Sequence, residues 1–168
     1  MRRMVVEITC VRGRSEPAGK GFYRRVFRVG DYVVKVYPGG EDVAATARRI
    51  VERNLELRRK LDFLPKFYGA AVAAVREDNQ LKVVVLTFHE RVKPVRIPRL
   101  PVARILEVVR RAADAGFVLD MKPSNFGEKD GKIYYLDEGG IGRGPIPPDV
   151  EEEWRSFLRS LRLGIRKR

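Results

Sequence analysis

The stretch GFVLDMKPSNFGEKDGKIYYLDEGG, which spans Gly116–Gly140, decides the fold expected of this chain of 168 residues. Its apolar run Phe117–Leu119 predicts a short strand that leads into a polar loop. The tight turn at Lys129–Gly131 then predicts a hairpin, and its second strand, Ile133–Leu136, is apolar enough to be buried. We therefore expect a small sheet with irregular, polar chain gathered at one end.

Four polar residues fall at that end of the predicted sheet. Asp120, Lys122 and Asn125 lie close together in irregular chain, and Asp137 comes directly after the second strand. Carboxylate and amide oxygens suit Mg²⁺, which usually takes one or two carboxylates together with phosphate oxygens. Ordinary turn chemistry around Pro and Gly residues is the alternative interpretation of the same pattern.

The chain before this stretch predicts a β-rich half with one helix. Two β-rich runs around Gly30–Asp31 predict a hairpin, and a small-residue loop, Ser15–Gly21, precedes it. Apolar residues at helical spacing predict a long helix from Glu41 to Leu61. The expected strands are Val5–Val11, Tyr23–Val29, Tyr32–Tyr37, Phe67–Val75 and Leu81–Phe88.

Lys35 stands inside the valine-rich strand of that hairpin. A buried amine needs an anionic partner, because an isolated charge is costly to remove from water. Glu52 and Glu56 lie one turn apart on the helix that follows, so either carboxylate could point at Lys35. The alternative is that Lys35 lies on the outer face of the sheet, in solvent.

The second half of the chain is predicted to begin with a helix after a linker. A Pro-rich basic stretch, Lys93–Pro101, is the best linker candidate, and Val102–Ala115 is an amphipathic helix that Gly116 ends. A final helix, Asp149–Leu163, precedes a basic tail. We expect two units: residues 1–90 with the sheet and the long helix, and residues 91–168 with the polar loops and the tail.

The net charge of +13 comes from 35 Lys and Arg against 22 Asp and Glu. A highly charged chain with few Asn, Gln and Cys residues is typical of hyperthermophile proteins, including archaeal ones, and that is our first explanation of the charge. The alternative is a nucleic-acid partner, RNA or tRNA, bound by the basic C-terminal tail. A single cysteine and the lack of a long apolar run favour a cytoplasmic protein with no membrane partner.

The ordered set of motifs resembles the protein-kinase-like superfamily. Gly116–Asn125 followed by Gly131–Gly139 is similar to its catalytic loop and metal loop. Tyr32–Lys35 resembles its strand lysine motif, Gly19–Gly21 resembles a shortened glycine-rich loop, and Val85–His89 falls where the hinge between lobes should lie. The resemblance implies an α+β, protein-kinase-like fold. Residues 1–90 would be a nucleotide-binding, antiparallel-sheet N-lobe with one helix, and residues 91–168 a truncated helical C-lobe with the catalytic and metal loops and the tail.

The resemblance also implies roles for individual residues. Lys35 would contact the phosphates of ATP, with Glu52 orienting it and Glu56 as the alternative. Asp120 would orient the attacking hydroxyl, and Lys122 would neutralise charge on the transferred phosphoryl group. The other implied contacts are Gly19 and Gly21 over the phosphates, Leu86 as gatekeeper, Thr87, Phe88 and His89 around adenine, and Asn125 and Asp137 on Mg²⁺ (or Mn²⁺).

The chain departs from the family pattern at three places. Leu119 replaces the arginine of the catalytic loop, Glu138 replaces the phenylalanine of the metal loop, and too few residues follow Gly139 for a full helical C-lobe. In this trimming the chain is similar to RIO kinases and to the small archaeal kinase of the tRNA-threonylcarbamoylation complex.

The implied function is phosphoryl transfer from ATP to a hydroxyl, as an atypical serine/threonine kinase acting on a protein or on itself. One alternative is an ATPase or switch subunit of an RNA-related complex, in which a partner subunit could complete the C-lobe. The other alternative is a nucleotide-binding pseudokinase that acts by docking.

Overall fold

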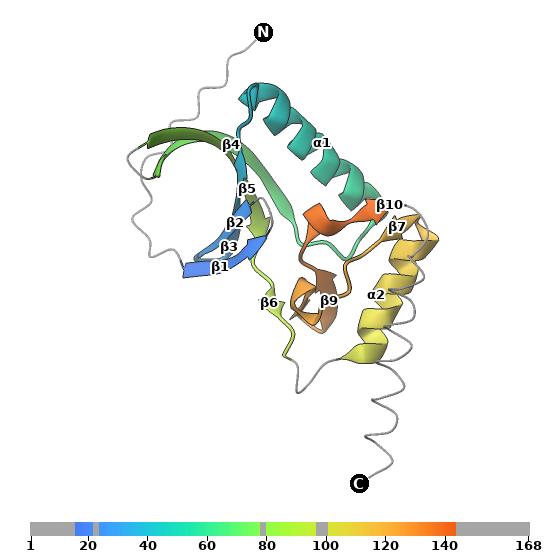
Figure 1. The fold of residues 1–168 in the computed structure, drawn as a ribbon. Helices are drawn as coiled ribbons and strands as arrows, with labels where there is room; N and C mark the ends of the chain where they lie inside the picture. Colours follow the sequence, from blue (N-terminus) through green and yellow to red (C-terminus); the bar gives the residue numbers. More distant parts are fainter. Residues whose placement is uncertain (1–15, 22–23, 78–79, 97–100, 144–168) are drawn as a thin grey trace.

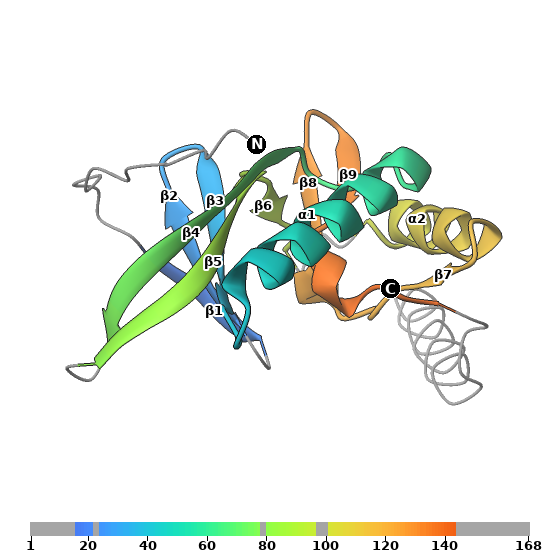
Figure 2. The same ribbon diagram turned by 90° about the horizontal axis from the view of Figure 1, so that it is seen from above.

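A computed structural model describes residues 16–21, 24–77, 80–96 and 101–143 of the chain. Its first half is a curved antiparallel sheet, and its second half is a smaller assembly around one helix (Figure 1). Helix α1 lies between the two, as the view from above also shows (Figure 2). The expected α+β class with an antiparallel sheet is confirmed. Within the described residues, no helix is both long enough and apolar enough to cross a membrane.

Five strands form the sheet in the order β1-β2-β3-β5-β4. The predicted hairpin is confirmed, since β2 and β3 pair with Val29 opposite Tyr32 and the turn residue Gly30 has a φ of 56°. That angle lies in the left-handed region, which glycine adopts without steric cost. The five strands are β1 Glu16–Gly21, β2 Arg24–Val29, β3 Tyr32–Pro38, β4 Phe67–Glu77 and β5 Gln80–Glu90.

The predicted loop Ser15–Gly21 is wrong for most of its length, because Glu16–Gly21 is strand β1. Its backbone pairs with β2, with Gly19 opposite Val26, and a bulge between Pro17 and Gly19 takes up the irregular step. Small residues suggested a loop, but backbone pairing to a neighbouring strand overrode that local preference. The predicted strand Val5–Val11 lies outside the described residues.

Helix α1, Val43–Lys60, confirms the predicted long helix. It begins after Asp42, whose side chain accepts a hydrogen bond from the Ala45 backbone N–H at 2.9 Å. That contact satisfies one unpaired donor of the first turn. The helix ends in a basic turn, Arg58–Lys60, which suits the negative end of the helix dipole. Leu57 is fully buried and anchors this end of the helix in the core.

The second half also follows the predicted order of elements. Helix α2, Val102–Asp114, ends before Gly116, whose φ is 80°. The hairpin of β8 and β9 turns at Asp130 and Gly131, both with positive φ, as a tight two-residue turn requires. The remaining elements are β6 Lys93–Pro94, β7 Phe117–Val118, η2 Pro123–Asn125, β8 Phe126–Lys129, β9 Lys132–Tyr135, η3 Glu138–Gly140 and β10 Gly142–Arg143.

One buried core joins α1 to the second half. Leu57 and Leu61 at the end of α1 pack in the same cluster as Ile105 and Val108 of α2 and Tyr135 of β9. The end of α1 is therefore packed in one core with the second half. The predicted helix 149–163 and the basic tail after it lie outside the described residues.

Candidate functional site

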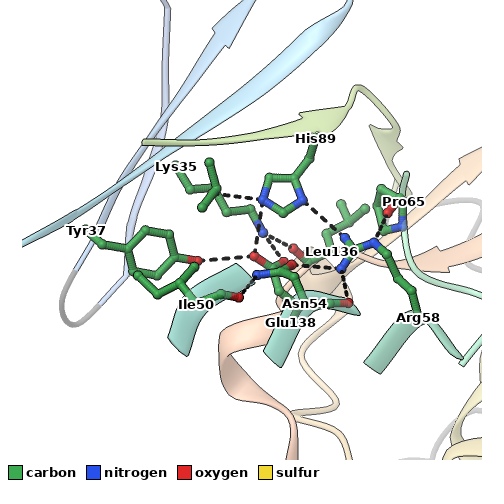
Figure 3. A network of polar contacts seen from close by, with 10 residues as sticks. Lys35, Tyr37, Ile50, Asn54, Arg58, Pro65, His89, Leu136 and Glu138 are labelled. Carbon is green, nitrogen blue, oxygen red and sulfur yellow. Dashed lines mark hydrogen bonds and ion pairs between the residues drawn. The ribbon is translucent and has the colours of Figure 1, made fainter. Parts of the chain in front are cut away.

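Lys35 is buried in the middle of β3, with its side chain turned toward the second half of the chain (Figure 3). Strands β2 and β5 flank β3, so its backbone is fixed on both sides. The Lys35 ammonium donates to the backbone carbonyl of Leu136 at 2.7 Å and forms an ion pair with Glu138. A residue of the sheet thus reaches the loop that follows β9, far away in sequence. The alternative of a solvated Lys35 is excluded.

The carboxylate that pairs with Lys35 is the one on Glu138, rather than the predicted Glu52. Both side chains of the pair are buried, with 6% of Lys35 and 5% of Glu138 exposed. Glu52 lies on the exposed face of α1. The alternative, Glu56, is ion-paired with Arg143 and with basic residues of α1. The expectation that a helix carboxylate holds Lys35 is corrected, because the face of α1 that meets this site carries other residue types.

That face presents Asn54 and Arg58, both of which point into the network of Figure 3. The Arg58 guanidinium donates to the Pro65 carbonyl at 2.8 Å, to Asn54 Oδ1 at 2.7 Å and to His89 Nδ1 at 3.2 Å. Burial lowers the pKa of Arg58, and the nearby Glu138 carboxylate opposes that shift. Arg58 remains charged, since a guanidinium is not deprotonated in proteins.

The contact with Arg58 fixes the chemical form of His89. Because a guanidinium N–H can only donate, Nδ1 of His89 must accept, and the ring hydrogen therefore sits on Nε2. That nitrogen lies 2.9 Å from the Thr87 hydroxyl and 3.6 Å from Glu138 Oε1. His89 is thus a neutral imidazole whose Nε2–H donates to the Thr87 hydroxyl.

Asp120 lies in the loop after β7 and is held through its backbone. Its N–H donates to the Tyr135 hydroxyl at 3.0 Å, and its carbonyl accepts from Asn125 Nδ2, also at 3.0 Å. Its carboxylate pairs with Lys122 Nζ at 2.9 Å, and the Lys122 side chain is 73% exposed. The backbone contacts hold the loop in place while the Asp120–Lys122 pair faces solvent.

Asp137 lies next to this loop, at the end of β9. The Leu136 N–H donates to the Asn125 carbonyl at 2.7 Å, which joins the two segments. Gly140 approaches Asp137 closely, since a Cβ on Gly140 would lie 2.5 Å from Asp137 Oδ2 and 3.4 Å from the Tyr135 hydroxyl. The Tyr135 hydroxyl therefore lies near both the Asp120 loop and the Asp137 turn. The structure brings Asp120, Asn125 and Asp137 to one end of the small sheet.

The remaining predicted residues lie in the first sheet. Gly19 and Gly21 lie on β1, and the chain passes from β1 to β2 through residues 22–23, which are outside the described residues. The other four belong to β5, which pairs with β3 on one side and β4 on the other. Their implied roles, one as gatekeeper and three around adenine, stay predictions. These four residues are Leu86, Thr87, Phe88 and His89.

The donor set at the end of β9 suits a hard divalent cation. Asn125 donates its amide nitrogen to Asp120, which leaves its side-chain oxygen as the atom that could coordinate a metal. Asp137 contributes a carboxylate, and Gly140 leaves the room that its Oδ2 needs. Among the described residues, no three His, Cys, Asp or Glu side chains gather as a ready-made metal cage. Magnesium needs only one or two carboxylates when phosphate oxygens complete its shell.

Three residues of this site were not predicted from the sequence. Glu138 was noted only as a departure from the metal-loop pattern, although its adjacency to Asp137 and the need of a buried lysine for an anion were both visible signals. Arg58 carried no signal, because a basic residue in a last helical turn is explained by the dipole. Tyr135 was predicted only as part of a buried strand, yet its hydroxyl accepts the Asp120 N–H.

No family model matches the chain, and no curated protein matches it. Among solved structures, it is similar to WbdD bound to the kinase inhibitor LY294002, with 19% identity and a TM-score of 0.45, over 84% of this chain and 36% of that one. It is also similar to the bifunctional kinase-methyltransferase WbdD, with 22% identity and a TM-score of 0.43, over 82% of this chain and 34% of the other.

The chain therefore spans about a third of the length of these WbdD chains. With identities of 22% or less and TM-scores below 0.5, the likeness does not establish relationship or activity. What the chain does must be inferred from its own geometry. The resemblance to RIO kinases and to the small archaeal kinase stays a prediction.

Proposed function

We propose that this chain is a minimal, kinase-like phosphotransferase that moves the terminal phosphoryl group of ATP to a hydroxyl. The observation that carries the proposal is the bond from Lys35 Nζ to the Leu136 carbonyl, because it brings a buried lysine to the residue directly before Asp137. A cationic amine next to a carboxylate that can hold a metal is the arrangement that a triphosphate needs.

Each residue of the site has a role in this proposal. Lys35 binds phosphate oxygens, while Asp137 and the Asn125 side-chain oxygen hold Mg²⁺, which would neutralise phosphate charge when bound. Asp120 positions the acceptor hydroxyl and takes its proton as the bond from oxygen to phosphorus forms and the bond to the ADP oxygen breaks. Lys122, on an exposed side chain beside Asp120, attracts the anionic group in transfer.

The energetic contribution of such a site is mainly positioning and electrostatics, since little covalent chemistry falls to the protein. This agrees with the way Asp120 is held: its backbone is fixed at both ends by hydrogen bonds, and its carboxylate faces solvent. The acceptor class is a hydroxyl, a serine or threonine of a protein or of this chain itself.

The test is incubation of the pure protein with γ-labelled ATP and Mg²⁺ or Mn²⁺, scoring label on protein and free phosphate separately. Asp137→Ala and Lys35→Ala should abolish turnover, while Glu52→Gln, on the exposed face of α1, should match the wild type. Label on protein supports the kinase. Free phosphate alone supports an ATPase or switch subunit. No turnover with a retained thermal shift by ATP supports a pseudokinase, and the absence of both contradicts a nucleotide site.

A further inference from the structure

The pairing of Lys35 with Glu138 shows how the buried lysine is held. We propose that Glu138 is the positioning residue of Lys35, and that the loop bearing Asp137, not helix α1, sets the place of the phosphate-binding amine. This inference rests on the proposed function, because the phosphate is its reason. Glu138 acts through Lys35 and is assigned no contact with substrate.

Glu138 supplies the anion that the buried ammonium of Lys35 needs. Breaking a buried pair by removing one partner leaves an uncompensated charge, so the partner of Lys35 matters to the site. The carboxylate of Glu138 lies within hydrogen-bonding distance of Lys35 Nζ. Glu52 is exposed, and Glu56 is ion-paired with other cations.

Glu138 is itself held by donors from the sheet. Its Oε1 accepts from the Tyr37 hydroxyl at 3.2 Å, and His89 Nε2 lies 3.6 Å from the same oxygen, beyond hydrogen-bonding distance. Figure 3 shows both side chains converging on the carboxylate with Lys35. A donor from β3, the Tyr37 hydroxyl, thus helps to fix a carboxylate from the second half, and that carboxylate can fix the lysine in turn.

The side chains that helix α1 contributes to this network are an amide, Asn54, and a cation, Arg58, and neither is acidic. Asn54 is buried, with its Nδ2 donating to the Ile50 carbonyl at 2.9 Å and its Oδ1 accepting from Arg58. Arg58 adds a positive charge to this side of the network, so α1 supplies a cation where a helix glutamate was expected. Because Glu138 directly follows Asp137, one short segment places both the lysine and the carboxylate that would hold the metal.

The test is a double-mutant cycle on the full chain, read as the dissociation constant for ATP with Mg²⁺ by calorimetry. Glu138→Gln should weaken ATP binding about tenfold or more, a factor of ten being about 1.4 kcal/mol. Glu138→Asp should recover part of that loss, and Glu52→Gln should stay within about twofold of the wild type, since its side chain is exposed. Lys35→Met and the Lys35→Met/Glu138→Gln double variant should bind ATP equally weakly.

A second measurement needs no nucleotide. In urea unfolding of the free proteins, the same cycle should show coupling between Lys35 and Glu138, because each single variant leaves a buried partner unmatched. If Glu138→Gln does not fold, Tyr37→Phe removes one donor from Glu138 and should weaken ATP binding by a smaller factor, about two- to tenfold.

The inference is overturned if a folded Glu138→Gln protein, or Tyr37→Phe in its place, binds ATP as the wild type does. It is also overturned if Glu52→Gln binds as weakly as Lys35→Met, or if the Lys35 and Glu138 effects simply add. In each of these cases the wild type still binds ATP, so the proposed function stands. A wild type that binds no ATP contradicts both proposals.

Discussion

Replacing Gly140 with alanine tests whether the position of the Asp137 carboxylate matters to the site. A Cβ at residue 140 would lie 2.5 Å from Asp137 Oδ2, and ordinary contact begins at 3.4 Å. The carboxylate must therefore recede by about 0.9 Å, and a displacement of about 1 Å in a positioned group can cost about 10²-fold in rate. We expect Gly140→Ala to lose about two orders of magnitude in Mg²⁺-dependent ATP turnover.

The same substitution should leave the fold almost unchanged. The atom that must move is the end of a side chain rather than backbone, so the melting temperature should shift by less than about 4 °C, which for a chain of this size is about 1 kcal/mol. The matched control is Gly142→Ala, because a Cβ there would meet only Val118 atoms at 3.9 Å. ATP turnover and its dependence on Mg²⁺ concentration are measured for both proteins. Wild-type turnover in Gly140→Ala would refute the reasoning.

Three further predictions concern the stability of the scaffold. Leu57→Ala, in the core shared by α1 and the second half, should cost about 2–5 kcal/mol in urea unfolding. Its control is Leu55→Ala on the exposed side of α1, where the cost should be about 0.5 kcal/mol or less. Arg58→Lys should destabilise by about 1–3 kcal/mol, because one ammonium cannot meet all three partners of the guanidinium, and exposed Arg59→Lys is its control. Burial opposes ionisation of Glu90, but Lys129 and the Lys66 N–H outweigh it and lower the pKa of Glu90. Its stabilising effect is thus present above the unfolded-state pKa of about 4.3 and lost as pH falls through the folded-state pKa, so Glu90→Gln should flatten the loss of stability below about pH 5 in acid unfolding.

Much of the fold could be predicted because local signals agreed with the final structure. Gly30–Asp31 and Asp130–Gly131 are turn pairs whose backbone angles the flanking strands require, and both hairpins form there. The apolar spacing of α2 matches the residues that the core buries, whereas α1 buries Leu57 and leaves Leu55 exposed. Strand β1 could not be predicted in the same way, since its pairing with β2 depends on a neighbour rather than on its own Pro and Gly residues.

The site could be predicted only as far as its separate segments. Asp120, Asn125 and Asp137 were expected at one end of the small sheet, and the Tyr135 hydroxyl and the Gly140 turn hold them there. The partner of Lys35 could not be fixed, because the carboxylates predicted for it, on α1, do not reach it. Helical periodicity fixes the rotation of α1 only to within a residue or two. It therefore could not show whether a carboxylate of α1 or one from elsewhere in the chain meets the buried amine.

The most direct test of the central claim is a crystal structure of the protein with Mg²⁺ and a non-hydrolysable ATP analogue. The proposed site predicts that the triphosphate contacts Lys35 Nζ and that the metal lies on Asp137 and the side-chain oxygen of Asn125, with the terminal phosphate facing Asp120. A nucleotide bound elsewhere, or a triphosphate that touches neither Lys35 nor Asp137, would contradict it.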